Sequence, residues 1–135
     1  MALLIDSSVI IELERRGLPA DTLILALPGE DLALSALTAS ELLFGVYRAD
    51  SAERRLRRQA FVESVLSGLP VFVFDFAVAR VHSRLGAQLA EAGRPIGAHD
   101  LLIAATAIAH GYDVLTANVR DFGGVPGLTV RQPMW

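Results

Sequence analysis

The feature that most constrains the fold is an apolar run with no polar face, Ala2–Ile5, near the start of the chain. A strand that is apolar on both sides is typical of a parallel sheet with helices on both faces. Asp6 follows this run at once, and a helical pattern begins after Ser7 and Ser8. Ligands of open α/β sheets bind outside the carboxyl ends of central strands, which is the position predicted for Asp6. For this stretch alone, a helix N-cap is the simpler interpretation of Asp6.

Strand-like and helical segments alternate along the rest of the chain. This alternation predicts an α/β fold with a mostly parallel central sheet, with Ala2–Ile5 near its centre and helices on both faces. The absence of repeats and linkers predicts one domain over residues 1–135. Further strands are predicted at 31–35, 71–74, 113–116 and 128–131, helices at 9–14, 38–47, 51–66, 77–92 and 101–109, an apolar segment of unassigned type at 21–27, and a loop at 118–124.

The composition excludes several kinds of chemistry. Because the chain has no cysteine, it can form no disulfide, no thiolate metal site and no cysteine nucleophile, and the cytoplasm is the expected compartment. No apolar window is long enough to span a membrane. The net charge is −3, so the surface as a whole does not indicate nucleic-acid binding. All basic residues are arginine, and one cluster of them is either a solvated helix face or a site for an anionic partner: Arg54, Arg55, Arg57 and Arg58.

Four acids, Asp6, Glu41, Asp100 and Asp121, each follow a predicted strand or begin an unusually apolar helix. In a parallel α/β sheet these positions share one edge, so the four carboxylates should converge on one cleft. Carboxylates that close repel one another unless a cation compensates them. Hard cations such as Mg²⁺ and Mn²⁺ prefer oxygen ligands, and the pattern therefore indicates a metal site.

Each acid also has a purely structural interpretation. Thr38 and Glu41 have the spacing of a capping box, Asp100 could cap the helix that follows it, and Asp121 could cap a turn. Asp75 follows a strand as well and is interpreted as a cap or turn residue. These interpretations are adequate one at a time, but they do not explain why the acids should gather at one edge.

Other catalytic patterns are missing from the sequence. His99 stands beside Asp100 and is interpreted as a surface or cap residue, and the remaining histidines lack the spacing of a zinc site. The chain has no G-x-S-x-G elbow, no P-loop and no G-x-G-x-x-G sequence. A phosphoacceptor domain of the receiver type would need a lysine on a late strand, and the chain has none.

Four segments together resemble the motif regions of PIN-domain ribonucleases, in particular the VapC toxins of bacterial toxin–antitoxin pairs: LLIDSSVII, TASELLFGV, IGAHDLLIAATA and LTANVRDFGGVPGL. The resemblance covers essentially the whole chain. It implies that Asp6, Glu41 and Asp100 are the principal catalytic and metal-binding acids. For the fourth position it implies a residue of the segment 116–122, which offers both Asn118 and Asp121. Asp121 is the preferred fourth acid, with Asn118 as the alternative or as a further polar ligand. The resemblance also implies that Ser7 and Thr116 orient metal-bound water.

The resemblance implies an endoribonuclease that requires Mg²⁺ or Mn²⁺, cleaves single-stranded or looped RNA, forms a homodimer and is neutralised by a cognate antitoxin. Helices 38–47 and 51–66 are the expected sites of contact with a partner chain. The arginine cluster at 54–58 would contact either the RNA backbone or an acidic face of the antitoxin. The alternative is a non-enzymatic PIN-like interaction module with an incomplete metal site.

Overall fold

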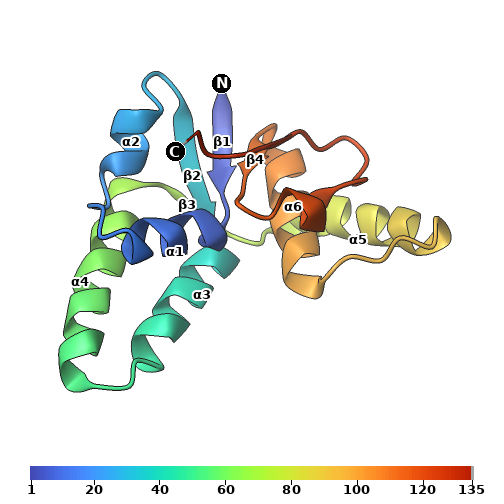
Figure 1. Ribbon diagram of the computed structural model, residues 1–135. Helices are drawn as coiled ribbons and strands as arrows, with labels where there is room; N and C mark the ends of the chain where they lie inside the picture. The colour runs from blue at the N-terminus through green and yellow to red at the C-terminus, as the bar shows by residue number, and fades with distance from the viewer. Residues whose placement is uncertain (135) are drawn as a thin grey trace.

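Five parallel strands form the central sheet of the computed structural model, which describes residues 1–134 (Figure 1). The strand order is β3-β2-β1-β4-β5, so β1 lies at the centre as predicted. Leu4 of β1 pairs with Ala33 on one side and with Val114 on the other. The strands are β1 (Ala2–Ile5), β2 (Asp31–Ser35), β3 (Val71–Phe72), β4 (Asp113–Leu115) and β5 (Val130–Arg131).

Helices cover both faces of this sheet, which confirms the predicted α/β class. One face carries α1 (Ser7–Arg15), α2 (Thr22–Ala26), α3 (Ala36–Tyr47) and α4 (Ala52–Gly68), and the other carries α5 (Phe76–Glu91) and α6 (Ala98–His110) (Figure 1). A short 3-10 helix, η1 (Val119–Phe122), follows β4. Within residues 1–134, no helix combines the length and the apolarity that a membrane span requires.

The apolar run of β1 supplies both hydrophobic cores. Leu3 and Ile5 are fully buried and pack with residues of α1 to α4, whereas Leu4, also fully buried, packs with residues of α5 and α6. Burying apolar side chains on both faces is what stabilises a central parallel strand. The lack of a polar face in Ala2–Ile5 is therefore explained by its place between the two cores.

Several predicted boundaries were wrong. β3 ends at Phe72 rather than at residue 74, because its partner strand β2 ends at Ser35 and leaves nothing to pair with the exposed Val73 and Phe74. β5 covers only 130–131 of the predicted 128–131, since the N–H of Leu128 bonds to the carbonyl of Val125 in a turn. The unassigned segment at 21–27 contains α2, and the predicted loop at 118–124 contains η1.

The predicted capping box of Thr38 and Glu41 was also wrong. The helix begins at Ala36, two residues earlier, and its N-cap is Ser35, whose Oγ accepts a hydrogen bond from the N–H of Thr38 (3.0 Å). Glu41 therefore lies in the second turn of α3, where no backbone N–H needs a cap. Its carboxylate is free for another role.

Candidate active site

Asp6 lies at the carboxyl end of the central strand and is only 6% exposed. Its N–H donates to the carbonyl of Leu115 (2.9 Å), which fixes Asp6 between β1 and β4. Although Asp6 occupies the N-cap position of α1, its side chain makes no capping bond. Its Oδ2 instead accepts from the hydroxyls of Ser8 (2.7 Å) and Thr116 (2.8 Å). Capping therefore does not explain this buried carboxylate.

The two hydroxyls that hold Asp6 are themselves held by the backbone after β4. The N–H of Ala117 donates to Ser8 Oγ (3.0 Å), and the N–H of Asn118 donates to Thr116 Oγ1 (2.9 Å). Among residues 1–134 these bonds leave Asp6 Oδ1 without a hydrogen-bond partner. The contact of Ser8 with the Asp6 carboxylate was not predicted from the sequence, and the spacing of two residues after Asp6 was the only signal for it. That Ser7 orients metal-bound water stays a prediction.

Glu41 faces α6 across the carboxyl edge of the sheet. Its Oε2 lies 3.4 Å from Nδ1 of His99, a residue 58 positions away in the sequence. Its Oε1 is buried and has no hydrogen-bond partner in the part of the chain that the structure describes. A buried carboxylate oxygen without a partner is costly unless a cation or a donor reaches it.

Asp100 is the third residue of α6, a helix held in place by buried apolar residues such as Ile103 and Ala107. The pKa of Asp100 is raised by burial, and further by the negative charges of Asp121, Asp6 and Glu41; His99 acts in the opposite direction. The other three acids that the sequence singled out therefore lie close enough to Asp100 for their charges to act on it, at one edge of the sheet.

A glycine makes room for the Asp100 carboxylate. A Cβ on Gly97, the N-cap of α6, would come within 3.3 Å of Asp100 Oδ2.

Asp121, in η1, shares with Asp100 a surface hollow of about 480 Å³. Asn118 lies just before η1 and does not line that hollow. Asp75 is confirmed as a cap, because its Oδ1 accepts from the N–H of Val78 at the start of α5 (2.9 Å).

The donor set fits a hard divalent cation by its chemistry. As the side chains lie, no group of three or more His, Asp or Glu residues within 1–134 is arranged to hold a metal ion. However, Asp6 Oδ1 and Glu41 Oε1 have no partner there, and burial and then the other acids raise the pKa of Asp100. Oxygen ligands with excess negative charge suit Mg²⁺ and Mn²⁺.

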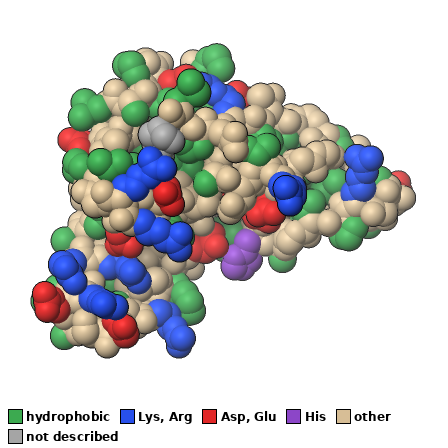
Figure 2. Space-filling view, viewed as in Figure 1, with side chains coloured by type: hydrophobic (Ala, Val, Ile, Leu, Met, Phe, Trp, Pro, Cys, Tyr) green, Lys and Arg blue, Asp and Glu red, His purple; other side chains and the backbone are tan. Residues whose placement is uncertain are grey.

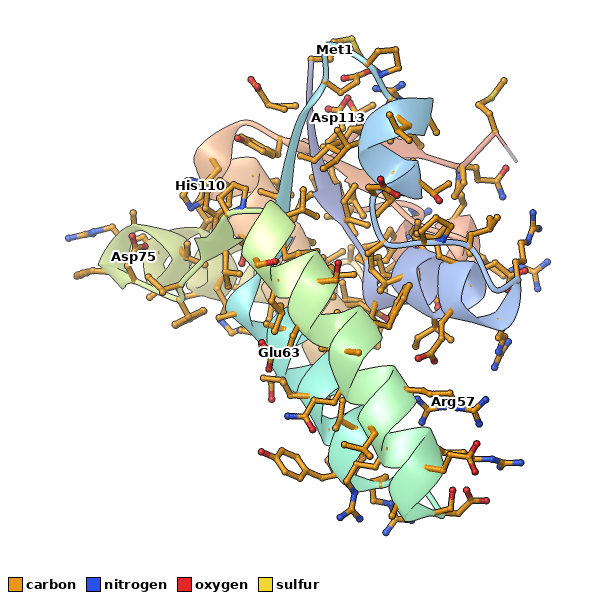
Figure 3. The ribbon with its side chains drawn as sticks, turned by 90° about the vertical axis from the view of Figure 1, so that its left-hand side faces the viewer. Met1, Arg57, Glu63, Asp75, His110 and Asp113 are labelled. Carbon is orange, nitrogen blue, oxygen red and sulfur yellow. The ribbon has the colours of Figure 1, made fainter. Side chains whose placement is uncertain are left out.

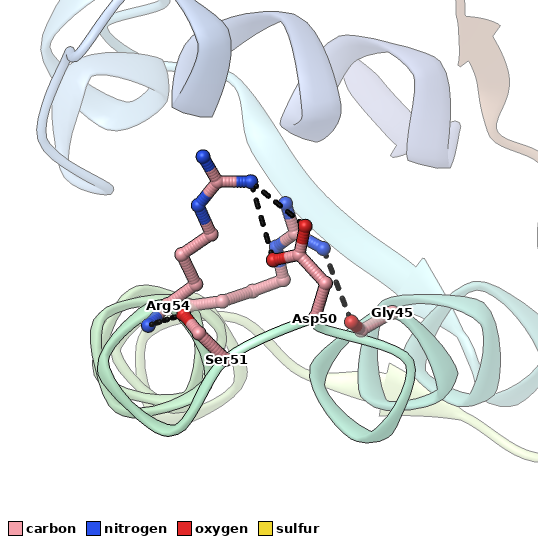
Figure 4. A network of polar contacts seen from close by, with 5 residues as sticks. Gly45, Asp50, Ser51 and Arg54 are labelled. Carbon is pink, nitrogen blue, oxygen red and sulfur yellow. Dashed lines mark hydrogen bonds and ion pairs between the residues drawn. The ribbon is translucent and has the colours of Figure 1, made fainter.

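The arginine cluster of α4 is largely engaged within the protein (Figure 4). Arg54 pairs with both carboxylate oxygens of Asp50 (3.1 and 3.2 Å) at the turn that connects α3 and α4. Arg58 donates to the carbonyl of Gly45 (3.1 Å) and pairs with Glu14 of α1 (3.2 Å), so it links three helices. Arg58 therefore helps to hold α4 against α1 and α3, whereas the Arg54–Asp50 pair is exposed and local. Arg55 donates to the carbonyl of Tyr47 (3.4 Å).

Comparison with known proteins agrees with the fold and with the resemblance. The PIN domain family model matches residues 3–127. Ribonuclease VapC1 of Rickettsia felis is 39% identical over 130 residues, which are 96% of this chain and 95% of the relative. Among solved structures, DNA-bound VapBC from Salmonella typhimurium superposes with a TM-score of 0.82 at 27% identity over 98% of both chains. VapBC-5 from Mycobacterium tuberculosis, of the VapBC family of toxin–antitoxin systems, superposes with a TM-score of 0.76 at 29% identity over 97% of this chain and 98% of the other.

The chain therefore belongs to the PIN-domain family, and within that family to the ribonucleases of the VapC type. The resemblance seen in the four sequence segments is confirmed.

Proposed function

We propose that this protein is a divalent-metal-dependent endoribonuclease and the toxin of a VapBC-type pair, acting in the cytoplasm and neutralised by a cognate antitoxin. The observation that carries the proposal is that carboxylates from separate segments lie at the carboxyl edge of the sheet with oxygens left unpartnered in residues 1–134, the buried Oε1 of Glu41 and Oδ1 of Asp6. Burial, and then the charges of Asp121, Asp6 and Glu41, raise the pKa of Asp100 beside them. Family membership adds the substrate class, RNA, through the names of its relatives.

In this proposal Asp6, Glu41, Asp100 and Asp121 hold Mg²⁺ or Mn²⁺, and Asn118 is a further ligand. The cation, when bound, neutralises charge on the scissile phosphate and activates a water molecule. Ser8 and Thr116 hold one oxygen of Asp6, so that its other oxygen is left for the site. His99 contacts one oxygen of Glu41 and leaves the buried one free.

The reaction should be tested by cleavage of a single-stranded RNA with and without EDTA. Attack of water on phosphorus that breaks the bond to the 3′ oxygen leaves 3′-hydroxyl and 5′-phosphate ends, and no cyclic phosphate forms because the neighbouring 2′-hydroxyl takes no part. Asp6→Asn and Asp100→Asn should each reduce the rate at least 100-fold, which corresponds to about 3 kcal/mol of transition-state stabilisation. Cleavage that persists in EDTA, or a cyclic phosphate product, would reject the proposal.

The fourth ligand is decided by two variants measured side by side, Asp121→Asn and Asn118→Ala. Asp121 is preferred because its charge acts on Asp100 and both residues line one hollow. We expect Asp121→Asn to weaken Mn²⁺ binding more than Asn118→Ala does. The reverse order would assign the position to Asn118. The non-enzymatic alternative predicts no difference between wild type and Asp6→Asn in Mn²⁺ affinity.

We further propose that two copies of the chain associate through α3 and the neighbouring edge of the sheet. Phe44 and Tyr47 of α3 are 65% and 74% exposed, and they line one surface with Val71 of β3. Large apolar side chains gathered on one surface are typical of protein interfaces. Sedimentation at micromolar concentration should give a dimer, and Phe44→Arg should shift it to a monomer. A wild-type monomer would contradict this assignment.

A further inference from the structure

Two arginines that have no role in the proposed reaction lie beside Asp100 and Asp121. The hollow that contains Asp100 and Asp121 is also lined by Arg94, from the segment between α5 and α6, and by Arg120 of η1. Figure 2 shows a basic side chain next to an acidic one over η1 and α6. Charges of both signs therefore share one hollow at the edge of the candidate active site.

Neither of these guanidiniums is neutralised by a carboxylate. Within residues 1–134, no Asp or Glu oxygen lies within 4.0 Å of Arg94 or Arg120, whereas Arg54 and Arg58 each have an acidic partner. The charges that act on the pKa of Asp100 are those of other acids and His99, and no arginine is among them. The two cations thus remain available to an anion that enters the hollow.

A backbone hydrogen bond fixes the position of Arg94, and a glycine leaves space for its side chain. The N–H of Arg94 donates to the carbonyl of Leu89 (2.9 Å), which fixes the residue at the end of α5. Across the hollow, Gly124 has a φ of +82°, and a Cβ there would come within 3.2 Å of Arg94 Nη1. Glycine at 124 therefore serves both a left-handed backbone and the space that the guanidinium occupies.

We propose that Arg94 and Arg120 form a binding site for an RNA phosphate next to the phosphate that is cleaved. This inference rests on the proposed function and names how its substrate is held. RNA that approaches a cluster of carboxylates on a protein of net charge −3 meets like charge. A guanidinium grips a phosphate with two parallel hydrogen bonds, so two unpaired arginines beside the acids offset that repulsion where the strand passes.

The first test is equilibrium binding of a fluorescently labelled single-stranded RNA in EDTA, where cleavage is not expected. The proteins compared are wild type, Arg94→Gln, Arg120→Gln, the double variant and Arg84→Gln. Arg84 is the matched control, an exposed arginine on α5 without a carboxylate partner in residues 1–134. The double variant should bind at least 10-fold more weakly, and the slope of log affinity against log salt should fall by about 0.7 for each phosphate that the variant no longer neutralises. The control should change less than 2-fold.

The second test locates the phosphate. Once the cleaved bond has been mapped, a neutral methylphosphonate replaces one neighbouring phosphate at a time. At one position it should raise the KM of wild type about 10-fold with kcat little changed, because the arginines hold this phosphate equally well in the substrate and in the transition state. The double variant should show no further weakening at that position.

The outcomes separate this inference from the proposed function. A double variant that binds RNA like Arg84→Gln would overturn the phosphate site, while loss of cleavage in Asp6→Asn would still support the nuclease. A wild type that does not cleave RNA would refute the nuclease, and the binding experiment would still decide the role of the arginines. If the double variant binds RNA normally but no longer binds a purified antitoxin, the arginines serve the protein partner and the phosphate site is wrong.

Discussion

At the scale of single residues, Asp100 is the acid whose ionised form the folded protein disfavours. It is held in the first turn of a buried helix, and its pKa is raised first by burial and then by Asp121, Asp6 and Glu41. An acid whose pKa is higher in the folded state than in the unfolded state destabilises the fold once it ionises. The destabilisation is absent below its ordinary pKa, near 3.8, and is fully present above the raised value.

Asp100→Asn should therefore stabilise the metal-free protein at pH 7. The gain should shrink as the pH falls through the raised pKa toward the ordinary value of aspartate, because the wild-type carboxyl then becomes neutral as well. Urea denaturation in EDTA at pH 7 and pH 4 measures the free energy of unfolding of the variant and of the wild type. Asp31→Asn is the control, because Asp31 begins β2 at the edge of the sheet away from the acids. Strong destabilisation by Asp100→Asn at pH 7 would mean that Asp100 is a structural cap instead.

His99 acts on Glu41 through a single ring nitrogen, Nδ1, at 3.4 Å. The amide nitrogen of asparagine occupies nearly the same place along the side chain as Nδ1, whereas leucine has no polar atom there. We expect His99→Leu to weaken Mn²⁺ binding about 3- to 10-fold and His99→Asn to remain within 2-fold of wild type. In a Glu41→Gln background the two His99 variants should bind Mn²⁺ alike. If the Mn²⁺ affinities of the two His99 variants still differ in the Glu41→Gln background, His99 does not act by positioning the Glu41 carboxylate.

At the scale of elements, the acids owe their places to the points where strands end and helices begin. Asp6 directly follows the end of β1, and Asp100 lies in the first turn of α6, where Gly97 leaves space for its carboxylate. The φ of Gly97 is −58°, which alanine adopts without strain. The glycine is therefore required by the neighbouring carboxylate and not by the backbone.

Gly97→Ala should keep the fold and impair the site. The added Cβ would crowd Asp100 Oδ2 at 3.3 Å, so the carboxylate must move by a few tenths of an ångström. We expect RNA cleavage to fall about 10-fold while the melting temperature changes little. Gly68→Ala is the matched control, because a Cβ at 68 meets no atom within 4 Å. Equal activity in both variants would show that the exact place of Asp100 is unimportant.

The sequence predicted the elements better than their ends. Ala2–Ile5 was recognisable because both of its faces are apolar, and parallel topology then brought the acids to one edge. The N-cap of α3 was misplaced because Ser35 and Thr38 are both favoured caps, and only the pairing of β2 decides between them. The contact of His99 with Glu41 and the hollow of Arg94 and Arg120 were not predictable, since they join segments far apart in the chain and depend on side-chain directions.

At the scale of the whole molecule, the sheet separates two cores and brings together acids from both sides of it. In Figure 3 Met1 and Asp113 mark the edge where β1 and β4 begin, opposite the edge that carries Asp6. The turn between α3 and α4 extends away from the sheet, with Arg57 projecting from α4 (Figure 3). A cation bound by Asp6, Glu41 and Asp100 would therefore connect the layer of α3 to that of α6.

Mn²⁺ should stabilise the folded protein by mass action. A ligand that binds only the folded state adds about 2.7 kcal/mol when its free concentration is 100 times its Kd. Thermal unfolding in a Mn²⁺ titration should show a rise in melting temperature that Asp6→Asn abolishes. Asp75→Asn serves as control, because Asp75 caps α5 and should lower stability without changing the response to metal. A response retained by Asp6→Asn would place the metal elsewhere.

The order of the acids along the chain has a consequence for synthesis. Asp6 and Glu41 are translated early, but β4, which pairs directly with β1, and the residues Asp100 and Asp121 come from the last third of the chain. A ribosome that has translated two thirds of the message has therefore made two of the four acids and no site. A product truncated before residue 100 would lack Asp100, Asp121 and the strand β4 that pairs with β1, and we expect it not to cleave RNA.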